Sequence, residues 1–308
     1  MRKISDFLKG KGLKPLRYEI RGKVMIIETN EGKFVIKEKN RQTNNDPIFS
    51  YLDSRNFNYY PKIITTENDD YEMTEYIDEV EMPKEQKMVD LIDLVSLLHN
   101  KTTHYKEIDE EDYKKIYEDI DNNIKYLSSY YNDIMTIIES KVFMSPAEYL
   151  FARNVSKIYG ALNFCQGELE KWKNIMETKK KQRFVVLHNN LDIDHFIRNK
   201  NSYLISWDKA KIDLPIFDLY KLYKRHGLDY DFEEILKHYE HSYPLLEEER
   251  KLLFILISLP DKIEFNKREY EMCKIISHQI DMLYKTEKIM SPHYTKDRKE
   301  NNQHKNEN

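Results

Sequence analysis

Short hydrophobic runs separated by polar turn residues mark the first ~75 residues, and this pattern predicts mostly β-strands. Two runs rich in β-branched residues, 23–29 and 33–37, flank Asn30-Glu31-Gly32. A short turn that contains glycine between two such runs predicts a β-hairpin. Asp46-Pro47 favours the start of a short helix, because Asp caps helices well and Pro suits the first turn. Further strands are expected at 17–20, 60–64 and 71–76.

The period becomes helical after Pro83, where apolar residues recur three and four positions apart. We interpret these stripes as helix faces that pack into a core. A short apolar run at 184–187 predicts a buried strand, and a small hairpin with its turn at 199–201 follows it. Helices are expected over 88–98, 113–127, 146–174 and 215–288.

This order of elements predicts an α+β fold with two lobes. Residues 1–76 are expected to form a small β-rich N-terminal lobe. Residues 77–290 are expected to form a large helical C-terminal lobe that contains the small hairpin. The segment 291–308 is polar and nearly free of apolar residues, so a disordered tail is expected.

Composition narrows the class of protein. The 50 basic residues are outnumbered by 54 acidic ones, and the net charge of −4 argues against broad nucleic-acid binding. The longest apolar run, 252–259, is far shorter than the ~20 residues that span a bilayer. Cys165 and Cys273 lie far apart in the sequence, which indicates neither a disulfide framework nor a cysteine zinc site. We therefore expect a cytoplasmic globular protein that binds neither nucleic acid nor membrane.

The polar loop at 188–195 follows a predicted strand and precedes a predicted hairpin, which is how kinase-like folds display a catalytic loop. Its sequence, His188-Asn189-Asn190-Leu191-Asp192-Ile193-Asp194-His195-Phe196-Ile197, is similar to the catalytic loop of the aminoglycoside phosphotransferase and choline kinase superfamily. The pattern of that superfamily is roughly His-Gly-Asp-Leu-His-x-x-Asn followed by two hydrophobic residues. The resemblance implies a two-lobed, protein-kinase-like fold.

Other segments resemble the same superfamily in the same order, from about residue 15 to residue 285. Residues 34–37 resemble the strand that presents the ATP-binding lysine, 73–77 the linker between lobes, 97–99 a Leu-His helix end, 203–208 the hydrophobic-Ile-Asp-Trp-Glu element, and 212–219 the Pro-x-x-Asp-Leu element. The run 18–37 and the linker are most similar to the kinase-like spore coat proteins of Gram-positive bacteria.

Three departures from the superfamily pattern fall on the residues nearest the chemistry. Asn190 stands where the resemblance implies the catalytic aspartate, and an amide cannot accept a proton at neutral pH. His195 stands at a magnesium-binding asparagine position, although magnesium prefers oxygen ligands. Ser206 stands at the position of the main magnesium aspartate and brings no charge. Loss of proton transfer by a placed side chain alone costs ~10²–10⁴-fold in rate, so we expect no active catalytic residue here.

Several residues of the superfamily pattern are retained. The resemblance implies that His188 and Asp218 hold the catalytic loop through hydrogen bonds. Lys37 matches the lysine that contacts nucleotide phosphates, and solvent exposure is its simpler explanation. No glutamate occurs over 40–66 to pair with Lys37, so Asp46 or Asp53 would have to substitute.

A displaced metal site is the alternative to loss of function. Asp208 keeps the second acidic position of the superfamily and could bind magnesium together with Asp192 or Asp194. A transition-metal site formed by His188, Asp192 and His195 is a further arrangement. Side chains of these types in a short loop more often face solvent or tie the loop, so we expect no metal.

Three hypotheses follow from these residues. The first is a catalytically degenerate kinase homologue with a structural or interaction role, such as a spore coat component, which needs no cofactor and binds other proteins. The second is an active ATP- and magnesium-dependent phosphotransferase for a small hydroxylated or amino compound. The third is a pseudokinase that still binds a nucleotide and uses it as a structural switch.

Overall fold

The computed structural model describes residues 2–22, 24–39, 46–65 and 70–306. The chain divides into two compact units, the first made of residues 1–102 with 188–211, and the second of 103–187 with 212–308. The sequence predicted a lobe boundary after residue 76, whereas this division places the following helix and the 188–211 segment with the N-terminal sheet. The reason is that helix α3 (Lys84–Thr102) packs against the small hairpin formed by residues 196–204.

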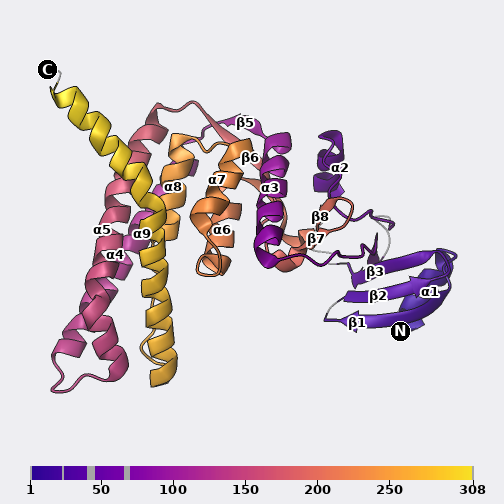
Figure 1. Cartoon of the computed structure of the whole chain (residues 1–308), viewed down its shortest axis with the longest axis horizontal. Coiled ribbons are helices and arrows are strands. Elements are labelled where there is room, and N and C mark those ends of the chain that lie inside the picture. Colours follow the sequence, from indigo (N-terminus) through magenta and orange to yellow (C-terminus); the bar gives the residue numbers. More distant parts are fainter. Residues whose placement is uncertain (1, 23, 40–45, 66–69, 307–308) are drawn as a thin grey trace. The chain divides into compact units, whose positions relative to one another are not determined.

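The first unit contains a four-stranded antiparallel sheet in the order β1-β2-β3-β4 (Figure 1). Its strands are β1 (Pro15–Arg21), β2 (Val24–Thr29), β3 (Gly32–Glu38) and β4 (Tyr71–Glu75). The predicted β2–β3 hairpin is confirmed, with Thr29 opposite Gly32 at the turn. Lys23, expected at the start of the second strand, lies outside the described residues.

One expected strand, at 60–64, is wrong. The segment makes a single bridge to β4, from Ile63 to Thr74. Two backbone hydrogen bonds, from Ile64 N to Met73 O and from Glu75 N to Lys62 O, accompany it. Pro61 lacks an N–H group, which limits how far a ladder can extend on this edge.

Helix α1 (Arg2–Gly10) was not expected from the sequence, and it covers one face of the sheet (Figure 1). Leu8 and Leu13 are buried and pack against alternate strand residues that point to this face. Those strand residues are Ile27, Ile36 and Met73. The remaining strand residues point to the opposite face, so the period-two pattern divides the sheet into a core face and a second, open face.

The rest of the first unit is built from short elements. Helix α2 (Asp46–Ser54) begins at the predicted Asp-Pro pair. The predicted small hairpin is confirmed as β7 (Phe196–Arg198) and β8 (Ser202–Leu204). Single 3₁₀ turns, η1 (Ile193–His195) and η2 (Trp207–Lys209), precede and follow it.

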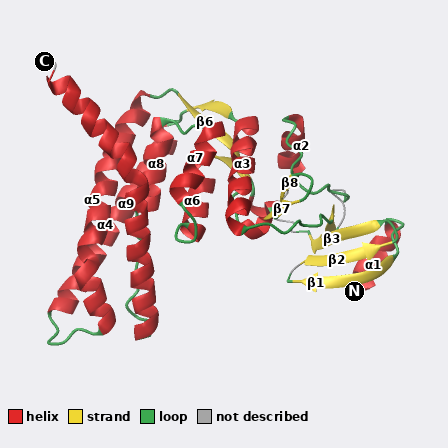
Figure 2. Cartoon of the chain, viewed as in Figure 1, coloured by secondary structure: helices red, strands yellow, loops and turns green. Residues whose placement is uncertain are grey.

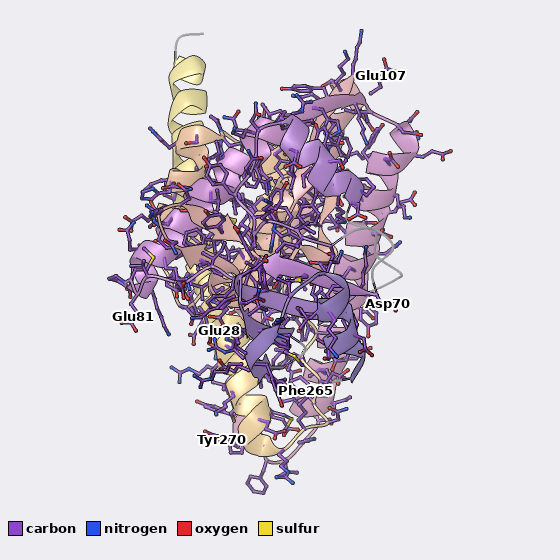
Figure 3. The ribbon with its side chains drawn as sticks, turned by 90° about the vertical axis from the view of Figure 1, so that its right-hand side faces the viewer. Glu28, Asp70, Glu81, Glu107, Phe265 and Tyr270 are labelled. Carbon is purple, nitrogen blue, oxygen red and sulfur yellow. The ribbon has the colours of Figure 1, made fainter. Side chains whose placement is uncertain are left out.

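The second unit is mostly helical (Figure 2). Its long helices α4 (Glu110–Glu139) and α5 (Pro146–Thr178) confirm two of the predicted stretches, and α5 packs against α4, α8 and α9. Ser145 and Glu148 form a reciprocal capping box at the start of α5. The other helices are α6 (Ile216–His226), α7 (Phe232–Ser242), α8 (Glu247–Ser258) and α9 (Glu269–Asn306). In Figure 3 the exposed side chain of Tyr270 projects from the first turn of α9.

A small sheet in the order β5-β6-β9 completes the fold. It comprises β5 (His104–Glu107), which was not expected, β6 (Lys181–Leu187) and β9 (Lys211–Asp213). Both cysteines are unpaired thiols. Among the described residues, no helix combines the length and the apolar composition that crossing a membrane requires.

The segment expected to be a disordered tail is helical as far as Asn306, where α9 ends. Its first residues have tertiary partners that composition did not indicate. The Tyr294 hydroxyl donates a 2.9 Å hydrogen bond to Glu168 of α5, and its ring lies edge-on to Phe164 with centroids 5.5 Å apart. Tyr294 thus contributes to holding the start of this segment against α5. Residues 307–308 lie outside the described residues.

Candidate functional site

A cavity of about 360 Å³ lies within the first unit, on the open face of the sheet. This volume is within the ~300–1,000 Å³ range of small-molecule pockets. The sheet contributes Val24, Ile26 and Val35 to its walls. The segment that follows the 188–195 loop contributes Ile197, Ile205 and Trp207. The cavity is therefore walled by apolar side chains, which suits a flat, apolar group such as an aromatic ring system.

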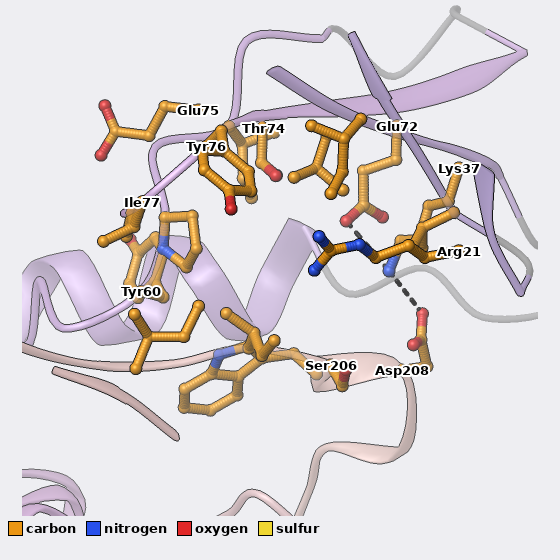
Figure 4. Close-up of a pocket in the computed structure, with 18 of the residues that line it drawn as sticks. Arg21, Lys37, Tyr60, Glu72, Thr74, Glu75, Tyr76, Ile77, Ser206 and Asp208 are labelled. Carbon is orange, nitrogen blue, oxygen red and sulfur yellow. Dashed lines mark hydrogen bonds and ion pairs between the residues drawn. The ribbon is translucent and has the colours of Figure 1, made fainter. Parts of the chain in front are cut away.

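Charged residues gather at one end of this cavity (Figure 4). The Lys37 ammonium lies 2.7 Å from a carboxylate oxygen of Asp208 and 3.1 Å from one of Glu72. Glu72 is the residue directly opposite Lys37 across the β3–β4 ladder. Burial alone would lower the pKa of Lys37, but the charge of Glu72 and the hydrogen bond that Lys37 donates to Asp208 outweigh burial and raise the pKa. Lys37 is therefore a protonated cation held by two carboxylates.

Neither partner of Lys37 was predicted from the sequence. Asp53, one of the two expected candidates, accepts a hydrogen bond from the Tyr60 hydroxyl. Burial and this bond to Asp53 raise the pKa of Tyr60 well above its ordinary value. The expected partner was a residue of 40–66, whereas Glu72 lies on β4. Its pairing with Lys37 depends on the register between β3 and β4. Arg21, whose guanidinium extends into the cavity in Figure 4, was also missed.

The ring of His195 is tied to the backbone of its own loop. Its Nδ1 lies 2.7 Å from the carbonyl oxygen of Asn190, and since a carbonyl only accepts, Nδ1 carries the proton and donates. The His195 carbonyl in turn accepts from Ile205 N at 2.9 Å. The residue at the implied magnesium position thus serves as a structural brace between the loop and the start of the next segment.

His188 is fully buried and supports the same loop. Its Nε2 donates to the carbonyl of Ile205 at 2.8 Å, and its ring meets Trp207 edge-on with centroids 4.8 Å apart. The Trp207 indole N–H is satisfied by Leu204 O at 2.8 Å. The loop-supporting role that the resemblance implied for His188 stays a prediction. Asp218 is buried in α6 of the second unit, and its role in holding the loop stays a prediction.

Ser206 lines the cavity and has a left-handed backbone, with φ of +67°. Among non-glycine residues, Asn and Asp adopt this conformation most readily, so an aspartate fits the backbone at position 206 as well as serine does. Asp208 and Asp194 also line the cavity.

The displaced transition-metal site does not assemble in this arrangement. Among the described residues, no group of three or more His, Cys, Asp or Glu side chains is placed to hold a metal ion. Asp192 accepts the backbone N–H of Asp194, which ties the loop as a local turn. His188 and His195 are each engaged by a backbone carbonyl, and their rings lie 6.3 Å apart. The arrangement of His188, Asp192 and His195 as a transition-metal site is therefore wrong.

The chain leaves β4 along the other end of the cavity, through Glu75, Tyr76 and Ile77 (Figure 4). The N–H groups of Glu75 and Tyr76 are used by the carbonyls of Lys62 and Lys33, each at 3.0 Å. Among the described residues, the N–H of Ile77 has no hydrogen-bond partner. A backbone donor beside an apolar slot can recognise one edge of a ring ligand.

The charge of the lining is predominantly acidic. Two basic side chains, Arg21 and Lys37, face five acidic ones, which are Glu72, Glu75, Glu79, Asp194 and Asp208. A polyanion that enters without cations meets net repulsion in this cavity.

No model of a protein family matches this chain, and no curated protein matches its sequence. Solved structures do match. An aminoglycoside phosphotransferase from Alicyclobacillus acidocaldarius subsp. acidocaldarius DSM 446 superposes with a TM-score of 0.68 at 9% identity, over 92% of each chain. A spectinomycin phosphotransferase, solved with ADP and spectinomycin, gives 0.53 at 13% identity, over 93% of this chain and 98% of its own.

The choline kinase LicA from Streptococcus pneumoniae gives a TM-score of 0.50 at 14% identity, over 94% of this chain and 98% of its own. Identities this low establish the fold alone. The fold is the protein-kinase-like α+β fold expected from the sequence, with a small N-terminal sheet and a large helical part.

Proposed function

We propose that this chain is a pseudokinase, a small-molecule kinase homologue that does not transfer phosphoryl groups and acts through other proteins. The observation that carries the proposal is the state of the three residues that replace the catalytic pattern. Asn190 and Ser206 bring no carboxylate. The Nδ1–H of His195 donates a hydrogen bond to the Asn190 carbonyl. Phosphoryl transfer depends on positioned carboxylates and magnesium ligands, and these positions no longer supply them.

The fold family implies ATP and magnesium, and the two fit this site differently. The apolar walls and the Ile77 N–H suit a nucleotide base. Lys37 is already paired with Glu72 and Asp208, and no described residues form a metal cluster. We therefore propose that any nucleotide binds without magnesium and weakly, and serves as a structural ligand.

The interaction role takes its specific form from sequence resemblance. Similarity of the N-terminal run and the linker to kinase-like spore coat proteins suggests a component or assembly factor of the spore coat. In a spore-forming host, an antibody against the chain is expected to detect it in extracts of the coat layer. Its confinement to vegetative cells would rule out this form of the proposal.

An active phosphotransferase is the second candidate, and one observation favours it. Asp194 and Asp208 both line the cavity, and carboxylate oxygens are ligands that magnesium accepts. The full chain, incubated with ATP, magnesium and panels of aminoglycosides and choline-like compounds, is expected to consume no ATP above background. Magnesium-dependent turnover that disappears in Asp208→Ala would overturn the pseudokinase proposal.

The matched variant restores the superfamily residues as Asn190→Asp, His195→Asn and Ser206→Asp together. It is expected to gain magnesium-dependent stabilisation by nucleotide that the natural chain lacks, because ligand binding to the native state raises its melting temperature. No gain in the restored chain would mean that features beyond these three residues also exclude magnesium.

Trp207 offers a direct readout of nucleotide binding. It lies in the cavity wall, whereas Trp172, the other tryptophan, is buried in α5 of the second unit. In a Trp172→Phe chain, ADP and ATP are expected to change the Trp207 fluorescence equally with and without magnesium. No change at millimolar nucleotide would remove nucleotide from the proposal and leave only a protein-binding scaffold.

A further inference from the structure

Strand β1 forms an edge of the N-terminal sheet and pairs only with β2 among the described strands. All seven of its residues are exposed. Three of them are large and apolar: Leu16 is 71% exposed, Tyr18 50% and Ile20 58%. Proteins normally protect edge strands with charges or cover them, because an exposed apolar edge templates pairing with another strand. On β1 the protection comes from Pro15 and from the charges of Arg17, Glu19 and Arg21, so it depends on which charges a partner strand sets opposite them.

The register of the sheet shows which way the backbone groups of β1 point. Arg21 pairs with Val24 across one tight turn, and Thr29 pairs with Gly32 across the next. Residues that flank a two-residue turn exchange hydrogen bonds, and bonded pairs alternate along the ladder. Both turns therefore indicate that the backbone N–H and C=O groups of the odd-numbered residues of β1 bond to β2. The N–H and C=O groups of Tyr18 and Ile20 consequently point to the open edge, whereas Leu16 lies at the register irregularity between Pro15 and Arg17.

We propose that a second copy of this chain pairs with this edge, antiparallel, about a two-fold axis that passes through Tyr18. This register places Tyr18 opposite Tyr18, so that their outward-pointing backbone groups meet and bond, and it sets Leu16 beside Ile20 at each end. It also places Arg17 opposite Glu19 on both sides of the axis. Two opposite-charge pairs and two apolar pairs therefore coincide with the register of fullest overlap.

The neighbouring registers are disfavoured by charge. A shift by two residues in one direction sets Glu19 opposite Glu19 and Arg17 opposite Arg21. A shift in the other direction sets Arg17 opposite Arg17. Like charges directly opposite each other destabilise a strand pair, so the alternation Arg17-Tyr18-Glu19-Ile20-Arg21 selects one register.

The pairing also covers apolar surface. Tyr18 and Ile20 lie opposite Ile27 and Met25 of β2, on the face that packs against α1. In the dimer the two apolar rows become neighbours, and the two four-stranded sheets join into one. The register irregularity between Pro15 and Arg17 falls at the end of the overlap, outside the central pairs. This inference stands on β1 alone and is independent of any kinase-like or pseudokinase activity.

The mass of the full chain, measured by light scattering over a concentration series, is expected to approach twice that of one chain. Arg17→Glu and Glu19→Arg each create like-charge pairs on both sides of the axis and are expected to weaken dimerisation about tenfold or more. The double swap of both residues is expected to restore it. Circular dichroism melts of each variant check that the fold is intact.

Cysteine cross-linking tests the register itself, in a Cys273→Ser background that removes the more accessible native thiol. Opposed residues of a bonded antiparallel pair lie ~5.5 Å apart, within reach of a disulfide. Tyr18→Cys is therefore expected to form a disulfide-linked dimer under mild oxidation. The matched control Ile20→Cys is expected to stay unlinked, because its own copy lies four residues away along the partner strand.

Three results would overturn the proposal. The first is a chain that stays monomeric at the highest concentrations tested. The second is a dimer that the single charge reversals leave unaffected, which would place the interface elsewhere. The third is equal cross-linking of Tyr18→Cys and Ile20→Cys, which would indicate random collision.

Discussion

Lys37 donates a 2.7 Å hydrogen bond to Asp208, a residue 171 positions later in the sequence. The bond joins strand β3 to the turn that follows the small hairpin, across the charged end of the cavity. Lys37 is also 3.1 Å from Glu72, so two carboxylates flank its ammonium group. The ammonium has three N–H donors, so the two carboxylates leave one donor for a phosphate, whose charge they would oppose.

Asp208→Asn separates the two kinase-like hypotheses. If Asp208 competes with phosphate for Lys37, removal of its charge is expected to tighten magnesium-free ADP binding by about 1 kcal/mol, or ~5-fold. If Asp208 is a magnesium ligand, the same variant loses affinity for magnesium nucleotide instead. Titration of Trp207 fluorescence in the Trp172→Phe background measures both. Asp194→Asn is the matched control for the magnesium-free titration, since Asp194 lines the same cavity and is not an ion-pair partner of Lys37.

His195→Ala is expected to lower the free energy of unfolding by about 1 kcal/mol, because it removes the Nδ1–H donor that satisfies the Asn190 carbonyl. Asp194→Ala, at the exposed neighbouring position, is expected to change stability by less than ~0.5 kcal/mol. Denaturant titration measures both variants. Equal effects would show that the His195 ring does not brace the loop.

Arg183 and Glu249 form a buried, bidentate ion pair in the second unit. Arg183 Nε lies 2.9 Å from Glu249 Oε1, and an Arg183 terminal nitrogen contacts Glu249 Oε2. Arg183→Met and Glu249→Leu are each expected to cost about 3–5 kcal/mol, because each leaves a buried charge unpaired. The double variant is expected to cost far less than the sum, and a double-mutant cycle in denaturant measures the difference. Lys237→Met, which breaks the exposed pair with Glu233, is the control and is expected to leave stability close to that of the natural chain. Additive losses in the buried pair would contradict this account.

Glu168 gives the second unit a predictable acid sensitivity. Burial would raise its pKa, but hydrogen bonds from Lys171, Lys251 and Tyr294 outweigh burial and lower the pKa below its ordinary value. A lowered folded-state pKa contributes stability that is present above the unfolded value of about 4.3 and is lost as pH falls through the folded value.

Glu168→Gln is therefore expected to destabilise the protein by about 1–2 kcal/mol at pH 7 and to approach the natural chain as pH falls through the lowered folded-state pKa. Unfolding titrations at a series of pH values measure the gap between the two chains. A gap that does not narrow on acidification would contradict the assigned pKa direction.

Local pattern was sufficient for most elements. The β2–β3 hairpin follows from two β-branched runs around a glycine turn, and α5 follows from a capped, periodic stretch. Local pattern failed where an element is short or depends on a distant partner. Helix α1 is nine residues long, and the 60–64 segment has strand-like composition but Pro61 on its pairing edge. The expected tail remains attached through Tyr294, whose partner Glu168 lies 126 residues earlier.

The sequence by itself determined the α+β fold class, the position of the loop at 188–195, and the residue types that occupy it, because periodicity and side-chain chemistry are local properties. Only the tertiary structure decided what those residues do. Strand register placed Glu72 beside Lys37, and folding of the hairpin brought Asp208 to the same cation. Tertiary structure likewise decided that the His195 ring donates to a backbone carbonyl. A hydrogen bond requires donor and acceptor atoms within about 3 Å, and separation along the sequence does not specify which atoms will meet.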